Sequence, residues 1–181
     1  MKPAVFLVLF GLLALPAMAA EFATRPGSTL GFTATFQGEE FEGTFKDFEA
    51  KIRFDPDDLA ASKFDVSIDL ASVATGDKDR DDVLPGSEFF NTGKFPKAHF
   101  VTTEIHRSGD AIVAEGTLSL KGVDKPVTLA VTYKPAADGA SLDVQTTLNR
   151  LDFNVGTGDY ADTSTIGNEV QVKAHLVLGS Q

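Results

Sequence analysis

The sequence contains no cysteine. This absence excludes a disulfide scaffold, a catalytic thiol and any metal site that depends on cysteine. Tryptophan is also absent, and there are only two tyrosines and two methionines. The aromatic residues are therefore almost all phenylalanine, of which there are 15. Phenylalanine brings large apolar area without a polar group, so these side chains are suited to a core or to an apolar cavity.

Long apolar runs are missing after residue 19. Before residue 19 there is one apolar run, over residues 4–15. Its length of about 12 residues is too short to span a bilayer but typical of a secretory signal peptide. Lys2 precedes it, and Ala17-Met18-Ala19 has the small-x-small pattern of a cleavage site. We therefore predict a signal peptide over residues 1–19, a single domain over residues 20–181, a periplasmic location and no stable insertion into the membrane.

Positive charge is also scarce. The chain has 16 Lys and Arg against 26 Asp and Glu, which gives a formal net charge of −10. Such a surface repels phosphate backbones, so nucleic acid is not an expected partner. The same charge favours solubility.

Beyond residue 21 the dominant pattern is an alternation of apolar and polar residues, which is typical of strands with one buried face. The alternating apolar sets begin with Leu30 to Phe36, Phe41 to Phe45 and Phe48 to Phe54. They continue with Phe64 to Leu70, His99 to Ile105, Ile112 to Leu120, Val127 to Tyr133, Leu142 to Leu148, a stretch around Phe153, and Val170 to Leu178. Short strands at even spacing predict an all-β antiparallel barrel or sandwich of about eight strands.

Three places interrupt this alternation. The apolar phase shifts by one residue at Lys46 and Asp47, which predicts a bulge or tight turn there. Residues 121–126 (KGVDKP) read as a loop. Residues 77–91 are rich in charge and do not alternate, so we expect a short helical segment that caps one end of the barrel.

Catalytic and metal-binding patterns are weak. His99, His106 and His175 do not pair at metal-ligand spacing, and no nucleophile or phosphate-binding motif occurs. The acidic run from Asp77 lacks the glycine of a calcium loop. Arg150 lies between apolar residues, which suggests either a structural ion pair or an anchor for a ligand headgroup. No enzymatic activity, metal or cofactor is predicted.

Several fragments resemble the YceI-like family, which is also described as lipocalin-like polyisoprenoid-binding proteins. The strongest is residues 116–127, GTLSLKGVDKPV, which is similar to the family pattern G-x-L-T-L-[KN]-G-V-T-K-P-V. The other fragments, in chain order, are Gly43-Thr44-Phe45, Phe54-Asp55-Pro56, Ser72-Val73-Ala74-Thr75-Gly76, Phe89-Phe90-Asn91, Phe95-Pro96, Arg150-Leu151-Asp152-Phe153 and Gly167-Asn168-Glu169-Val170. One departure is Val83, where members of the family often have histidine.

The resemblance implies an extended lipocalin-like barrel with a long hydrophobic tunnel. It also implies an isoprenoid or another long-chain lipid as ligand, such as a quinone-type molecule, a fatty acid or an aliphatic amide. It implies no catalytic residues, and it allows a homodimer. A tunnel is compatible with the phenylalanine content, although the same residues could instead fill a solid core.

We therefore predict a lipid-binding protein whose ligand lies inside the barrel. The residues predicted to contact it are Phe32, Phe36, Phe45, Phe89, Phe90, Phe95, Phe100, Leu118, Leu120, Leu129, Val131, Phe153 and Arg150. Two alternatives remain at this point. The first is a non-catalytic stress or redox accessory protein with a filled barrel that acts through surface contacts. The second is a lipid hydrolase or isomerase with titratable groups inside a cavity.

Overall fold

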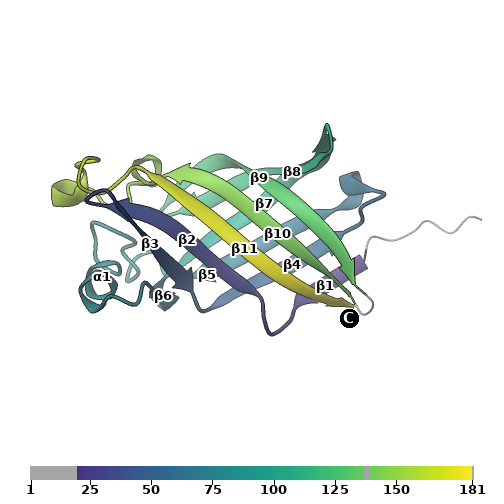
Figure 1. Cartoon of the computed structure of the whole chain (residues 1–181), viewed down its shortest axis with the longest axis horizontal. Helices are drawn as coiled ribbons and strands as arrows, with labels where there is room; N and C mark the ends of the chain where they lie inside the picture. Colours follow the sequence, from purple (N-terminus) through teal and green to yellow (C-terminus); the bar gives the residue numbers. More distant parts are fainter. Residues whose placement is uncertain (1–19, 137–138, 181) are drawn as a thin grey trace, which may run out of the picture.

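The chain folds into an antiparallel β-barrel whose loops and short helices gather mainly at one end (Figure 1). The structure, a computed structural model, describes residues 20–136 and 139–180. The predicted signal peptide lies outside the described residues. The strands are β1 (Ala20–Thr24), β2 (Thr29–Phe36), β3 (Glu39–Phe45), β4 (Phe48–Phe54), β5 (Lys63–Asp69), β6 (Val73–Ala74), β7 (Lys97–Ser108), β8 (Ala111–Leu120), β9 (Val123–Ala136), β10 (Gly139–Asn149) and β11 (Glu169–Ser180).

The barrel closes on itself. Its wall runs through β1, β4, β5, β7, β8, β9, β10 and β11, and β1 pairs with β11 to complete the ring. The first half of β11 pairs instead with β2, which forms a hairpin with β3. This arrangement confirms the predicted antiparallel barrel of about eight strands, with β2, β3 and β6 extending its wall.

The cap end of the barrel consists of residues 70–96 and 150–168. It holds the short helices η2 (Leu70–Ser72), α1 (Lys78–Val83), η3 (Arg150–Phe153) and η4 (Gly158–Tyr160), whereas η1 (Leu59–Ala61) lies near the opposite end. Helix α1 confirms the predicted helical cap segment. The Asp77 carboxylate accepts from the backbone N–H of Arg80 at 3.0 Å, and Asp81 accepts from Thr75. The hydrogen bonds that Asp81 accepts from Thr75, first the one from the hydroxyl and then the one from the backbone N–H, lower the pKa of Asp81.

The break between β3 and β4 occurs where the apolar phase shifts. Lys46 and Asp47 separate the two strands, and their backbone N–H groups donate to the backbone and side chain of Ser72. Phe45 and Phe48 consequently both line the interior, although they are an odd number of residues apart. The predicted irregularity is therefore present, and its effect is to keep phenylalanine on the inner face of both strands.

Three local predictions were wrong. The buried face of β7 is Ala98, Phe100 and Thr102 and not the alternating set His99, Val101 and Thr103, and Ile105 is buried only because the register shifts between Thr102 and Glu104. Residues 121–126 do not form a loop, because Lys121 and Gly122, both with positive φ, make a two-residue turn and β9 begins at Val123. This turn geometry matches the right-handed twist of the flanking strands. The stretch around Phe153 is not a strand but the helix η3, which ends at Asn154 in the left-handed conformation.

Strand β7 contains an irregularity that a buried hydroxyl stabilises. The register between β7 and β8 shifts between Thr102 and Glu104. The buried Thr102 hydroxyl accepts from the Phe64 backbone N–H at 2.9 Å and donates to the Phe64 carbonyl at 3.3 Å. One side chain thus satisfies the backbone groups of a neighbouring strand that would otherwise be buried without partners.

Replacing Thr102 with valine should lower the free energy of unfolding by about 2 kcal/mol, because it leaves two buried backbone groups of Phe64 unpaired. The measurement is urea unfolding followed by circular dichroism. Thr128→Val, which makes the same change at an exposed position of β9, is the control and should shift stability by less than about 0.5 kcal/mol. Equal stability of the two variants would contradict this role of Thr102.

Candidate functional site: an apolar cavity in the barrel

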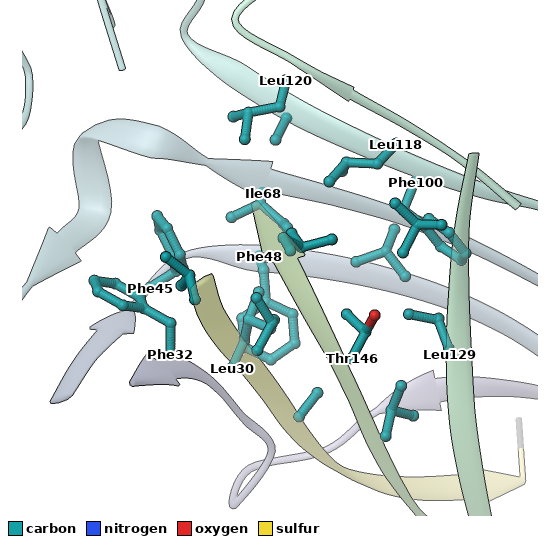
Figure 2. A pocket seen from close by; sticks show the side chains of 18 of the residues that line it. Leu30, Phe32, Phe45, Phe48, Ile68, Phe100, Leu118, Leu120, Leu129 and Thr146 are labelled. Carbon is teal, nitrogen blue, oxygen red and sulfur yellow. The ribbon is translucent and has the colours of Figure 1, made fainter. Parts of the chain in front are cut away.

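A cavity of about 200 Å³ lies inside the barrel (Figure 2). Its wall is formed by inward-facing residues of β2–β5 and β7–β11, and its cap end by Leu70, Phe90, Phe153 and Val155. Several wall residues, such as Leu129 and Val144, keep partial exposure because they face this space rather than another side chain. An eight-stranded barrel is wide enough for either a filled interior or one small ligand. This barrel is filled by side chains over one part of its length and open over another.

The end opposite the cap is filled by side chains. Phe54, Leu142 and Leu178 are at most 2% exposed, and none of them lines the cavity. The Phe54 ring contacts the rings of Phe64 and Tyr133, with centroids 6.0 and 5.0 Å apart. We call this packed layer the floor. Among the described residues it fills the end of the barrel opposite the cap, so the cavity lies in the part of the barrel nearer the cap.

Most of the residues predicted to contact a ligand line the cavity. They are Phe32, Phe45, Phe90, Phe100, Leu118, Leu120, Leu129, Phe153 and Arg150. Two of the phenylalanines cover glycines on neighbouring strands. A Cβ atom at Gly43 would lie 2.2 Å from the Phe32 ring, and one at Gly116 would lie 2.5 Å from the Phe100 ring. These glycines therefore allow the rings to lie flat against the wall, which leaves the centre of the barrel open.

The other four predicted residues lie outside the cavity lining. Phe36 is 39% exposed at the tip of the β2–β3 hairpin, beyond the barrel interior. Phe89 contacts Tyr160 within the cap, at 4.7 Å between centroids. Phe95 covers the β8–β9 turn, where a Cβ atom at Gly122 would lie 2.8 Å from its ring. Val131 faces inward as predicted, but it belongs to the cluster around the floor.

The sequence reasoning missed several lining residues. The alternating pattern already placed most of them on apolar strand faces, Ala98 and Val155 excepted, but nothing in it indicated their height along the barrel axis. The missed residues are Leu30, Phe48, Ile52, Phe64, Val66, Ile68, Leu70, Ala98, Val127, Val144, Thr146, Leu148, Val155, Val170, Val172, Ala174 and Leu176. Among all the lining residues only Thr146 and Arg150 carry polar side chains.

Arg150 forms no ion pair within the described residues and bonds to backbone carbonyls instead. The Nε atom donates to the carbonyl of Gly167 and Nη2 to that of Ile166, while Nη1 donates to Val155 and Gly156, all at 2.6–3.0 Å. The residue is 6% exposed, and burial lowers the pKa of its guanidinium. Arg150 therefore ties two cap loops together, and this use of its N–H groups corrects the expected carboxylate partner.

Other titratable contacts lie on the outside of the barrel. Asp143 accepts from Lys134 at 2.8 Å and lies 2.6 Å from Nδ1 of His175. Hydrogen bonds from Lys134 first, and then from His175, hold the pKa of Asp143 below its ordinary value. No group of three or more His, Asp or Glu side chains among residues 20–136 and 139–180 is arranged to hold a metal ion.

The fold and its pocket define a class: a small antiparallel barrel with an interior suited to one apolar ligand. The sequence profile of the YceI-like domain matches residues 24–178. The chain therefore belongs to the YceI-like family, as its motifs indicated. Members of this family are typically periplasmic and generally non-catalytic.

Individual relatives agree with this assignment. Protein YceI of Escherichia coli O157:H7 is 37% identical over 121 residues, a match that spans 64% of this chain and only 63% of that protein. BcnA of Burkholderia cenocepacia has a solved structure that is 35% identical, with a TM-score of 0.79 over 82% of this chain and 94% of that chain. A polyisoprenoid binding domain from Saccharophagus degradans shares the fold at 18% identity and a TM-score of 0.67, covering 90% of this chain and 99% of that one.

Helices of the described segments are short. None of them has the length and apolar character needed to cross a membrane.

Arg150→Lys should destabilise the fold by about 3 kcal/mol while keeping the charge, because an ammonium group cannot reach four carbonyls in the plane of a guanidinium. Chemical unfolding monitored by circular dichroism measures the change. The control is Arg107→Lys at an exposed position, where the guanidinium meets only the Pro56 carbonyl, at 3.2 Å. If both variants lost the same small amount, Arg150 would not be the tie between the cap loops.

Proposed function

We propose that this protein is a periplasmic carrier that holds one long apolar lipid in its cavity. The candidates are polyisoprenoids, including quinone-type molecules, and long-chain fatty acids or amides. Export would follow from the predicted signal peptide, whose removal leaves residues 20–181 as a single binding domain. The polyisoprenoid binding domain from Saccharophagus degradans, which shares the fold, supports the choice of ligand class.

The chemistry of the cavity wall carries this proposal. A space of about 200 Å³ has room for about seven water molecules at about 30 Å³ each, and each buried water needs two to four polar partners. The wall offers two polar side chains, and Arg150 already donates to four carbonyls. Water is therefore poorly accommodated, and an apolar chain is the occupant that the wall favours.

The energetics indicate how long such a chain must be. Burial contributes about 0.8 kcal/mol per CH₂ group, whereas association costs roughly 4–15 kcal/mol in lost freedom. A ligand held mainly by apolar contact must therefore bury on the order of ten to twenty carbon atoms. This requirement selects long aliphatic or prenyl chains over short hydrocarbons.

The two alternatives receive less support. An accessory protein that acts through its surface would need an exposed apolar patch, yet the exposed large apolar residues of the described chain are Phe36 and Val83. A lipid hydrolase would need titratable groups that converge inside the cavity. Arg150 is the one ionisable residue of the lining, and its guanidinium is occupied by carbonyl contacts.

Native mass spectrometry of protein purified from the periplasm of its own cells tests the carrier function directly. We expect a bound species that survives purification and is recovered by solvent extraction as a long-chain lipid. Apo protein would be offered geranylgeraniol in parallel, with displacement of the apolar dye N-phenyl-1-naphthylamine as the readout. Repeated recovery of protein without lipid, together with no displacement, would rule out the carrier function.

Leu118→Trp and Phe100→Trp should each lower the affinity for geranylgeraniol at least tenfold, because the indole ring occupies cavity volume. Thr117→Trp is the matched control, since Thr117 is adjacent on β8 but exposed on the outer face. Cooperative unfolding of each variant would establish that the barrel is intact. Undiminished uptake by folded Leu118→Trp and Phe100→Trp proteins would mean that the lipid lies elsewhere.

A further inference from the structure

Strands β9 and β10 separate toward the cap end. Their pairing begins at Ala136 and Gly139 and ends at Ala130 and Gln145. Beyond that pair, β9 remains bonded to β8 and β10 remains bonded to β11. Within the described chain, no strand pairing joins residues 123–129 of β9 to residues 146–149 of β10. We call this gap in the ladder the window; Figure 2 shows the two green strands diverging there.

The window is bounded and flanks the cavity. The Ala130–Gln145 pair bounds it on the floor side. On the cap side, the Lys121 Nζ atom donates to the Asn154 carbonyl at 2.6 Å and so links the β8–β9 turn to the end of η3. Cavity-lining residues stand on both edges: Val127 and Leu129 on β9, and Thr146 and Leu148 on β10. The window thus places two unpaired strand edges beside the apolar pocket.

Thr146 lines the cavity at the window with a hydroxyl that has no hydrogen-bond partner among the described residues. Its hydroxyl makes no hydrogen bond with any residue between 20 and 136 or 139 and 180, in contrast to the Thr102 hydroxyl. A hydroxyl group in an apolar wall is costly unless it finds a hydrogen-bonding partner. Figure 2 shows Thr146 on the strand that faces Leu129, within the ring of apolar side chains.

Charged partners do not suit this position. Transfer of an ionised group from water into an apolar wall is far more costly than transfer of a hydroxyl or a carbonyl. Arg150 is committed to four carbonyls, and Lys121 to that of Asn154. Lys125 shares the inward face of β9 with Val127 and Leu129 but stands outside the cavity lining, two residues to the cap side of Val127.

We infer that Thr146 hydrogen-bonds an uncharged oxygen group of the ligand at the window, and that this contact selects lipids with an alcohol, carbonyl or amide function. The inference rests on the proposed carrier function and adds a selectivity to it. The alkyl or prenyl chain lies in the pocket, while its oxygen-bearing end lies between β9 and β10. Residues 123–129 and 146–149, which no strand pairing joins within the described chain, offer this end backbone groups as further neutral partners.

The test compares Thr146→Val with Thr147→Val, an identical change at the next, exposed residue of β10. Dissociation constants come from dye displacement by geranylgeraniol, its diphosphate, and a prenyl hydrocarbon of equal carbon number. Thr146→Val should weaken binding of the alcohol about three- to tenfold and leave the hydrocarbon unchanged, since a neutral hydrogen bond contributes a factor of this size. Thr147→Val should alter neither, and the wild type should prefer the alcohol to the diphosphate.

Equal losses for alcohol and hydrocarbon would show that Thr146 only shapes the cavity, and no loss for either would remove its role; both results overturn the inference. Tighter binding of the diphosphate would overturn the uncharged headgroup.

Photolabelling gives an independent readout. A geranylgeranyl ether of benzophenone should label peptides containing residues 123–129 or 146–149, and labelling confined to the cap loops would contradict the position of the headgroup at the window. If no prenyl compound displaced the dye from the wild type, the carrier function itself would fail.

Discussion

Backbone hydrogen bonds between β1 and β11 close the sheet into a ring, and the open interior depends on this closure. A closed wall pairs most of its own N–H and C=O groups and needs no side chains at the centre for that purpose. An open sheet would have to cover its apolar face with another layer. The barrel instead can leave part of its inner face uncovered, which is the condition for a pocket of this size.

The packed part of the interior and the cavity occupy different heights along the barrel axis. The floor holds three of the most deeply buried large side chains, Phe54, Leu142 and Leu178. At the cap end, an apolar cluster that includes Leu70, Phe89 and Phe153 is joined by hydrogen bonds. These are the four that Arg150 donates, and those that the Glu88 carbonyl accepts from the backbone of Gly156 and Thr157. The cap is thus held together without filling the space beneath it.

The alternation of apolar residues was enough to predict the fold class and most inner faces, because strand side chains point in opposite directions with a period of two. It could not assign height along the axis. Val131 and Leu129 share one face of one strand, yet the first belongs to the floor cluster and the second lines the pocket. Phe95 was misplaced for another reason: its contact with Gly122 is a tertiary one that no local pattern encodes.

For Thr146, too, the sequence pattern gives the inner face of the strand but not the position of the residue in the barrel. In the sequence it is one of two consecutive threonines, and its inward direction follows from parity with Leu142 and Leu148. Its significance depends on where β9 and β10 stop pairing, which is a property of three-dimensional register. For Arg150, the position among apolar residues was visible in the sequence. Its four carbonyl partners could not be predicted, because they come from loops that meet only in the folded chain.

The floor limits the ways in which a molecule can enter and leave the cavity. A conduit must be open at both ends, so that cargo enters on one side and leaves on the other. Here Phe54, Tyr133 and their neighbours fill the end opposite the cap, so the routes into the cavity lie at the cap end and at the window between β9 and β10. Under the proposed carrier function, a lipid would be loaded and released on the same half of the molecule, so that half would face donor and acceptor in turn.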